Sequence, residues 1–454
     1  MPYLSLNPAS GEMLGQFPSW DPALIQAALE STTLAQQSWS RATLAQRAVP
    51  MANAAQVLRA RRDAFGALIT AEMGKPVAEA RAEVEKCALA CDFYAGHAAQ
   101  FLLEEAIPTD AGHSYVSYRP LGTVLAVMPW NFPFWQVFRF AAPALMAGNA
   151  ALLKHASSTP QCALAIEDIF RTAGFPEHLF TTLMIEAADV ATAIASPHVQ
   201  AVTLTGSEAA GRQVAAAAGA HLKKCVLELG GSDAFVVLAD ADLDWAASQA
   251  VASRFLNCGQ SCIAAKRIVV APEIADPFVA LLREKIAALR VGDPLDESTQ
   301  LGPLARRDLR DELHRQVGES IDQGAEALLG CAPLPGAGFY YAPSLLDRVT
   351  PGCRAYHEEL FGPVAVVIRA RDEDDAIRIA NDTRFGLGSS LWSRDTQRAE
   401  RLSREIQAGC SFINGMVKSD PRLPFGGIKD SGFGRELSRH GMHEFVNAKT
   451  VWVK

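Results

Sequence analysis

Long hydrophobic runs are missing from this sequence of 454 residues. The longest apolar stretches, such as residues 124–128, are far shorter than the roughly 20 residues that a membrane-spanning helix needs. Residues 1–8 contain neither the basic segment nor the apolar segment of a secretory signal. We therefore expect a cytoplasmic protein that does not act on membranes.

Cysteine is scarce and irregularly spaced. The nine cysteines are at positions 87, 91, 162, 225, 258, 262, 331, 353 and 410. An odd number without regular spacing argues against a disulfide scaffold and is typical of reduced thiols in a reducing compartment. The closely spaced pairs at 87 and 91 and at 258 and 262 lack the further ligands that zinc requires, so no metal is expected.

Several common functional motifs are also absent. No G-x-G-x-x-G fingerprint follows a predicted strand, and there is no P-loop. No G-x-S-x-G elbow occurs and the ten histidines are scattered, so a serine hydrolase is not supported. The formal net charge of −8 and the pI near 5.7 argue against a nucleic-acid partner.

What is present is typical of a large globular protein. Hydrophobic residues make up 49% of the chain and charged residues 20%, a balance that excludes a disordered chain. A chain of 454 residues is long for one hydrophobic core, so two or more domains are expected.

The order of the predicted elements indicates an α/β fold. Residues 4–18 predict a strand and a turn, and residues 22–101 have a helical pattern broken at 74–76. From residue 122 on, short β-runs alternate with helices, which predicts parallel sheets built from βαβ units. The first series has strands at 122–128, 150–154, 199–205, 226–229 and 234–238, with helices at 134–147, 159–173 and 208–219. The second has strands at 268–270, 364–368, 389–392 and 411–413, with helices at 276–289, 373–382 and 395–407.

Two α/β domains are expected, with the junction near Gly230 and Gly231. Residues 115–118 and 446–454 have the pattern of further strands. A strand at the chain end often pairs across a subunit interface, and an ordinary edge strand explains the pattern equally well.

The segment 257–262 is a candidate site for a nucleophile. Cys262 follows a Gly-Gln-Ser sequence at a loop-to-strand junction, where backbone N–H groups can surround a thiol. A thiolate needs such donors to be stabilised. An intracellular cysteine is also commonly a small buried hydrophobe, and this segment alone favours that explanation.

Other polar residues follow the predicted strands, where α/β folds place their sites. Asn131 lies between two prolines, so its amide could be held rigidly, as an oxyanion hole requires. Lys154 could bind a ribose or a phosphate, and the turn at 206–207 could offer N–H groups to a pyrophosphate. Glu228, beside apolar residues, could act as a base with a raised pKa. Taken singly, each also has an ordinary structural explanation: a turn, a solvated cation or a salt bridge.

Taken together, these motifs resemble the aldehyde dehydrogenase superfamily, and specifically its bacterial succinate-semialdehyde dehydrogenases. The seven collinear segments are 129–133, 153–154, 205–211, 227–231, 259–262, 358–363 and 424–434. The resemblance implies a Rossmann-type cofactor domain, an α/β catalytic domain and a small oligomerisation β-extension. The implied ranges are 1–110 and 121–230 for the cofactor domain, 231–435 for the catalytic domain, and 111–120 and 436–454 for the oligomerisation strands of a homodimer or homotetramer.

The same resemblance assigns roles to individual residues. Cys262 would be the nucleophile, the Asn131 amide and the Cys262 N–H would hold the oxyanion, and Glu228 would activate water. NAD or NADP would be the cofactor. Its implied ligands are Trp130, Lys154, Ser157, Gly206, Ser207, Glu359 and Phe361.

Ser157 bears on the choice of cofactor. NAD-selective relatives often have a glutamate at this position, three residues after the lysine, where it holds both ribose hydroxyls. A carboxylate would repel a 2′-phosphate, whereas a serine can donate a hydrogen bond to it. The sequence therefore removes a barrier to NADP without showing a preference for it.

The implied substrate is a carboxylated aldehyde, succinate semialdehyde. Arg139 and Ser419 match the residues that bind the distal carboxylate in that subgroup, although Arg139 could instead form a structural salt bridge. The second arginine of the subgroup is replaced by Leu256, and Arg254 nearby is out of register. A broader aliphatic or aromatic aldehyde dehydrogenase therefore stays open. A CoA-acylating enzyme is disfavoured by Glu228, and a non-catalytic binding protein by the intact Cys262.

Overall fold

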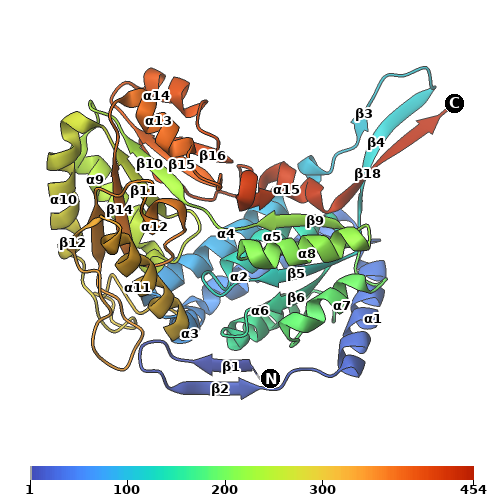
Figure 1. Ribbon diagram of the computed structural model, residues 1–454. Helices are drawn as coiled ribbons and strands as arrows, with labels where there is room; N and C mark the ends of the chain where they lie inside the picture. Colours follow the sequence, from blue (N-terminus) through green and yellow to red (C-terminus); the bar gives the residue numbers. More distant parts are fainter. Residues whose placement is uncertain (1–2) are drawn as a thin grey trace.

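The computed structural model describes residues 3–454 (Figure 1). Strands β1 (Tyr3–Leu6) and β2 (Met13–Phe17) form the antiparallel hairpin expected at 4–18. Four helices follow, as the pattern over 22–101 predicts: α1 (Pro22–Trp39), α2 (Leu44–Ala60), α3 (Arg62–Met73) and α4 (Val77–Phe101). Helix α3 ends at Gly74, whose φ of 84° is left-handed, so the predicted break at 74–76 is confirmed.

A six-stranded sheet carries the first βαβ series, except that the strand predicted at 234–238 lies in the second large sheet, after the chain has crossed over at Gly230 and Gly231. The order of the six strands is β17-β9-β8-β5-β6-β7, and only β17 (Gly432–Phe433) is antiparallel. The other strands are β5 (Thr123–Met128), β6 (Ala150–His155), β7 (Phe180–Thr182), β8 (Ala201–Thr205) and β9 (Lys224–Glu228). Helices α5 (Trp135–Ala147), α6 (Pro160–Thr172), η1 (Ala187–Asp189), α7 (Val190–Ala195) and α8 (Glu208–Ala220) connect them. The chain runs outward from β5 in both directions, and such a change of direction opens a crevice at the carboxyl ends of the strands.

A seven-stranded sheet carries the second series, in the order β12-β13-β14-β11-β10-β15-β16. Its strands are β10 (Asp233–Val237), β11 (Ala265–Val270), β12 (Glu326–Leu329), β13 (Ser344–Asp347), β14 (Val364–Arg369), β15 (Gly388–Trp392) and β16 (Cys410–Ile413). All neighbouring pairs are parallel except β12 with β13. Its helices are α9 (Leu243–Phe255), η2 (Leu256–Gly259), η3 (Pro272–Ile274), α10 (Ala275–Ala287), α11 (Arg307–Asp322), α12 (Arg354–His357), α13 (Glu373–Asn381) and α14 (Thr396–Ser403).

The chain passes from one sheet to the other between β9 and β10, which enclose Gly230 and Gly231. The C-terminal part does not stay with the second sheet, because β17 returns to pair with β9 after the short helix η4 (Lys429–Ser431). Helix α14 ends at Ser403, four residues before the predicted end at 407. The domain ranges drawn from the sequence remain a prediction.

A three-stranded arm completes the molecule. Strands β3 (Glu105–Ala106), β4 (His113–Pro120) and β18 (Val446–Val453) form a sheet in the order β18-β4-β3, and α15 (Ser438–Glu444) leads into β18. Figure 1 shows this arm projecting away from both large sheets, with the C-terminus at its tip. The predicted terminal strand is present and pairs with β4 of its own chain. Within residues 3–454, no helix combines the length and the apolar character needed to cross a bilayer.

Helix α5 is the most buried helix of the first half. All 13 of its residues are buried, including the polar Gln136 and Arg139. It packs against α2 and α4 on the face of the six-stranded sheet. Because a helix buried all round has no solvated face, Arg139 has to find its partners inside the protein.

Candidate active site

Two cavities lie near the predicted site residues. One, of about 200 Å³, is lined by Cys262, Arg139, Ser419 and Leu256, together with other side chains. The other, of about 600 Å³, is lined by Lys154, Ser157 and residues of β1 and α11. Both predicted substrate residues thus line the smaller cavity, and two of the seven predicted cofactor residues line the larger one. No cluster of three or more potential metal ligands occurs within residues 3–454.

The loop that ends at Cys262 has an unusual backbone. Asn257 and Cys258 both have a φ of 55°, and Gly259 has a φ of 74°, so three consecutive residues are left-handed. A Cβ on Gly259 would lie 2.2 Å from the carbonyl oxygen of Gly362. This contact requires glycine, because the loop is pressed against the segment that precedes β14.

Arg254 holds this loop in place through hydrogen bonds to backbone carbonyl oxygens. The fully buried guanidinium donates to the carbonyl oxygens of Val364 at 2.7 Å and Gly259 at 3.2 Å. It also donates to those of Leu360 and Gly362. Burial lowers the pKa of Arg254 to about 9, so these carbonyl contacts hold a charged group. Arg254 lies outside the substrate cavity, and its role is to anchor the nucleophile loop to residues 360–364.

Cys262 borders the smaller cavity directly before β11. Burial raises the pKa of its thiol to about 12, although Lys266 and Arg139 oppose this effect. Lys266 donates to the carbonyl oxygens of Ser261 and Cys262, each at 2.7 Å, and forms a 2.9 Å ion pair with Glu359. The thiol of the free protein is therefore protonated at neutral pH, and a base has to remove its proton before it can attack.

Cys258 has a different environment. It is fully buried, and its Sγ accepts a hydrogen bond from the Gly302 N–H at 3.2 Å. Burial raises the pKa of this thiol above its ordinary value. Cys258 and Cys262 are both free thiols in the structure. Cys258 therefore packs the loop, whereas Cys262 faces the cavity.

Asn131 lies beside the nucleophile loop. Its Nδ2 donates to the carbonyl oxygen of Gln260 at 3.1 Å, and its own carbonyl accepts from Asn257 Nδ2 at 2.7 Å. The rigidity expected from the flanking prolines thus comes through direct contacts with the loop. An amide nitrogen has two hydrogens, so Nδ2 can donate a second hydrogen bond to an oxyanion that forms beside it.

Glu228, at the end of β9, is a fully buried carboxyl. Neither of its side-chain oxygens has a hydrogen-bond partner within residues 3–454. Burial raises its pKa well above the ordinary value, and the charge of Glu436 raises it further. Cys410 lies within electrostatic range of both Glu228 and Cys262. A carboxyl with a raised pKa and no internal partner is suited to exchange a proton with water.

Arg139 links these carboxyls to the substrate cavity. Its guanidinium forms a buried ion pair with Glu436 and donates to Thr205 Oγ1 at 3.3 Å. It also lies 4.8 Å from the Phe425 ring centroid. The salt bridge that the sequence allowed for Arg139 is therefore present, and the same side chain lines the cavity with Cys262.

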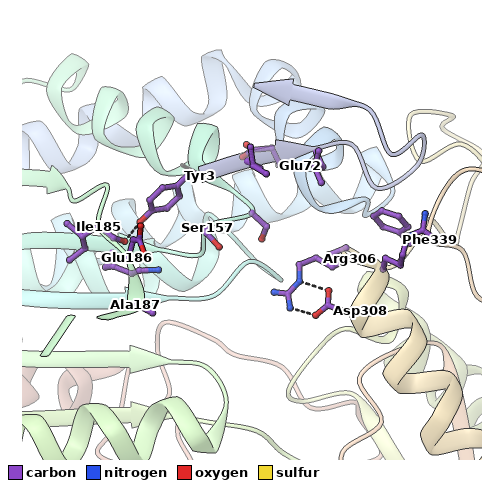
Figure 2. A pocket seen from close by; sticks show the side chains of 15 residues that line it. Tyr3, Glu72, Ser157, Ile185, Glu186, Ala187, Arg306, Asp308 and Phe339 are labelled. Atoms are coloured by element: carbon purple, nitrogen blue, oxygen red, sulfur yellow. Dashed lines mark hydrogen bonds and ion pairs between the residues drawn. The ribbon is translucent and has the colours of Figure 1, made fainter. Parts of the chain in front are cut away.

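The larger cavity lies beside β1 and the carboxyl end of β6 (Figure 2). Figure 2 shows Tyr3, Ile185 and Ser157 on one wall and the Arg306–Asp308 ion pair across from them. Lys154 Nζ donates to the carbonyl oxygen of His155 at 2.9 Å, and Ser157 is exposed. An ammonium group and a free hydroxyl around this space fit a ribose or a phosphate ester.

The turn before α8 is already capped by the protein. Ser207 is the N-cap, and its Oγ accepts from the Ala210 N–H at 3.4 Å. The Gly206 N–H donates to the carbonyl oxygen of Glu228 at 3.0 Å. The remaining N–H groups of the first turn of α8 are the ones that can bind an anion.

Glu359, Phe361 and Trp130 are connected to the nucleophile loop through Lys266, whose Nζ pairs with Glu359 and lies 5.8 Å from the Phe361 ring centroid. Glu359 accepts from the Gly231 N–H at 3.2 Å in addition to its ion pair with Lys266. The Trp130 and Phe361 rings meet edge to face at 5.8 Å between centroids. These contacts place the three predicted cofactor residues near Cys262.

Several residues that contact the predicted site residues are not marked by any sequence motif. Lys266 and Glu436 lie outside the matched motif segments, although each contacts a predicted site residue. Lys86, from α4, lines the smaller cavity and donates to Ser419 Oγ at 2.7 Å. The available signal was the charged series Glu79, Glu83 and Lys86, whose spacing places the three residues on one face of α4, with Lys75 two residues before the helix begins.

Known proteins match this chain over almost its whole length. The model of the aldehyde dehydrogenase family matches residues 2–451. Succinate-semialdehyde dehydrogenase (NADP+) 1 of Mycobacterium ulcerans is 50% identical, with 100% of both chains covered. Succinate semialdehyde dehydrogenase (NAD(P)+) Sad of Escherichia coli is 46% identical over 99% of this chain and 97% of its own.

Solved structures show the same fold. The crystal structure of succinic semialdehyde dehydrogenase from Streptococcus pyogenes in complex with NADP+ superposes with a TM-score of 0.97. The two sequences are 37% identical, and the superposition covers 99% of each chain. The mixed α/β architecture of this chain is therefore the one that these relatives share.

Proposed function

This chain belongs to the aldehyde dehydrogenase family, and on that premise we propose that it oxidises succinate semialdehyde to succinate with NADP or NAD. The observation that carries the proposal is the small cavity that brings the Cys262 thiol together with Arg139 and Ser419. A thiol can attack an aldehyde, while a cation and a hydroxyl in the same space favour a carboxylate at the far end of a short substrate. Relatives that carry this substrate in their names cover the whole chain.

In the proposed mechanism, the Cys262 thiolate adds to the aldehyde carbon, and the carbonyl oxygen takes the negative charge. The Asn131 Nδ2 and the Cys262 N–H donate to that oxygen. Collapse of the thiohemiacetal re-forms the carbonyl as the C–H bond breaks, leaving a thioester on Cys262. A nicotinamide cofactor, when held by the residues named below, would accept this hydride. Glu228 then removes a proton from water, which attacks the thioester, releases succinate and restores the thiolate.

The residues around the larger cavity fit the adenosine part of that cofactor. Lys154 and Ser157 supply a cation and a hydroxyl for a ribose or its 2′-phosphate. The first turn of α8, after Gly206 and Ser207, suits a pyrophosphate. Trp130, Glu359 and Phe361 lie toward Cys262, where the nicotinamide end would be held.

The substrate proposal is tested by steady-state kinetics on the unmodified protein. We expect kcat/KM for succinate semialdehyde to exceed that for butanal, a neutral aldehyde of the same length, by at least about 10-fold, because a charge-assisted hydrogen bond contributes about 1.5–3 kcal/mol. NAD(P)H formation is followed by absorbance with each cofactor. Equal or faster turnover of butanal would overturn the proposal.

Equal or faster turnover of butanal would support a broader aliphatic or aromatic aldehyde dehydrogenase. The observation that favours it is Leu256, which lines the cavity where the subgroup would place a second arginine. The apolar side chains of Phe132, Trp135 and Ile263 line the same space and suit an uncharged substrate.

Ser157→Glu is expected to shift the cofactor preference toward NAD. A carboxylate at this exposed position would repel the 2′-phosphate, so the ratio of kcat/KM for NADP to that for NAD should fall about 100-fold. Ser157→Ala, which only removes a hydroxyl, should lower the ratio by about 10-fold or less. An unchanged ratio in Ser157→Glu would show that the 2′-phosphate binds elsewhere.

The assembly and the location of the protein are also proposals. The arm formed by β3, β4 and β18 supports a homodimer or homotetramer, because β18 leaves one edge without a described partner strand. Trp452 and Val453 on that strand are about half exposed, at 49% each. A cytoplasmic location fits the nine free cysteines.

A further inference from the structure

Lys86 is partly buried and differs from the fully buried cations around the active site. Lys75 is paired with Glu83, Lys266 with Glu359, and Arg139 with Glu436. Lys86 forms no ion pair with any residue of the range 3–454. Its contacts are Ser419 Oγ at 2.7 Å and the Trp135 ring, whose centroid lies 4.3 Å from Nζ.

An ammonium group without an ion-pair partner in a partly buried site is unfavourable in free energy. Transfer of a charge from water into protein is unfavourable unless an opposite charge or several hydrogen bonds compensate for it. Burial, followed by the nearby Arg139, lowers the pKa of Lys86 to about 8. The group is therefore still mostly protonated at neutral pH, and two of its three N–H donors have no polar acceptor among its recorded contacts.

The position of Lys86 directs this charge at the substrate. It lines the same cavity as Cys262, with Leu256 and Phe425 among the apolar walls. Apolar walls exclude water and strengthen an electrostatic contact with a bound anion. Position 256 on the nucleophile loop is a leucine and supplies no cation to the cavity. Lys86 on α4 supplies one to the same space.

The other residues on this face of α4 hold it in place. Glu83 accepts from the backbone N–H groups of Phe134 and Trp135, each at 2.9 Å, and so fixes the start of α5. Glu79 accepts from the Asn257 N–H at 2.8 Å and so joins α4 to the nucleophile loop. Lys86 is therefore carried by a helix tied to both walls of the cavity.

We propose that Lys86, together with Ser419, binds the carboxylate of the aldehyde substrate and is the residue that selects carboxylated over neutral aldehydes. Arg139 contributes less to this selection, because Glu436 already neutralises its charge and its contacts hold the carboxyl group beside Glu228. The inference rests on the proposed function and names the residue that sets its substrate class.

The test is a comparison of the Lys86→Met, Lys86→Arg and Lys418→Met variants as full-length proteins with NADP. The quantity measured is the ratio of kcat/KM for succinate semialdehyde to that for butanal. Lys86→Met should lower this ratio by about 10- to 100-fold, mainly through KM, since it removes a charge-assisted hydrogen bond. Lys86→Arg keeps the charge and should restore most of the ratio. Lys418 lines the same cavity but is exposed, so Lys418→Met should have a much smaller effect.

The outcomes separate this inference from the proposed function. If the unmodified protein shows no preference for succinate semialdehyde over butanal, the proposed function is wrong. If it shows the preference and Lys86→Met keeps it, the role of Lys86 is wrong. An equal loss in Lys86→Met and Lys418→Met would also overturn the role, because it would indicate general attraction of an anion and not a built site.

A second measurement needs no variant. The ratio for the unmodified protein should fall as the pH rises through about 8, because Lys86 loses its proton there. The charged and titratable groups around Lys86 are Glu83 and Cys87 on α4, Arg139 on α5 and Asp420 in the loop after β16. Glu79, Lys418 and Cys262 line the same cavity, and burial raises the pKa of Glu79 to about 7, so the fall attributed to Lys86 is the part that occurs above that pH. Using the ratio to butanal cancels the titration of Cys262 and Glu228, which both substrates share. A ratio that is flat between about pH 7 and about pH 9 would contradict the proposal even if Lys86→Met does not fold.

Discussion

Cys262→Ala is expected to lower the rate of NAD(P)H formation from succinate semialdehyde by about 10⁴-fold or more, because removal of a covalent nucleophile leaves only binding and oxyanion stabilisation. Without the thiol no thiohemiacetal forms, and the aldehyde carbon stays a poor hydride donor. Steady-state absorbance and the absence of a pre-steady-state burst measure the loss. Thermal unfolding should change little, since Cys262 is partly exposed and Lys266 holds the loop through backbone carbonyls.

The matched control is Cys258→Ala in the same loop. Cys258 accepts the Gly302 N–H inside the protein, so this variant should lose stability, by about 1–2 kcal/mol, and keep most of its turnover. The assignment of the nucleophile would be reversed if Cys258→Ala were inactive and Cys262→Ala active. Comparable activity in both variants would show that neither thiol forms the covalent intermediate.

Glu228→Gln is expected to stop the reaction after the first half. Hydride transfer precedes hydrolysis, so one equivalent of NAD(P)H per active site should appear in a burst while steady-state turnover falls about 10²- to 10⁴-fold. Mass spectrometry of the quenched protein should show the succinyl thioester on Cys262. A variant that loses the burst together with turnover would indicate that Glu228 is needed earlier, to deprotonate the thiol.

The pH dependence of this step follows from the environment of Glu228. Its pKa is raised, and the base works only when ionised, so hydrolysis should decline as the pH falls through a value well above the ordinary carboxyl range. Glu436→Gln removes a negative charge that contributes to this rise and frees Arg139 to face Glu228. Both changes lower the Glu228 pKa, so the pH at which the rate of hydrolysis declines should become lower. A shift to higher pH would contradict this account.

The sequence predicted the sheets well where apolar runs were long. Strands β5, β6, β8 and β14 and helices α5, α6 and α13 lie within a few residues of the predicted ranges. Strands β7, β12 and β13 were missed, because each has only three or four residues and lacks a clear alternation. The return of β17 to the first sheet depends on a two-residue pairing that no local pattern encodes.

The sequence predicted individual active-site residues on loops, but it did not predict the contacts among their side chains. The match of motifs picked out Cys262, Asn131 and Glu228, and the structure places Asn131 in contact with the Cys262 loop. The ion pair in which Glu436 neutralises the charge of Arg139 was not predictable, because almost 300 residues separate the two in the sequence. Lys86 was missed for another reason: charged side chains along one face of a helix usually point to solvent, whereas this face of α4 borders the cavity.

The anchoring of the nucleophile loop by Arg254 also limits how the protein can change during evolution. Gly259 has no room for a Cβ because of the Gly362 carbonyl, and that same carbonyl accepts from Arg254. A Cβ on Gly362 would in turn meet Leu313 on α11 at 2.4 Å. The fitness effect of a substitution at one of these positions therefore depends on the residues at the others. Such epistasis should keep these positions unchanged together. New substrate ranges should therefore arise from substitutions in the cavity walls, while the loop that carries Cys262 keeps its sequence.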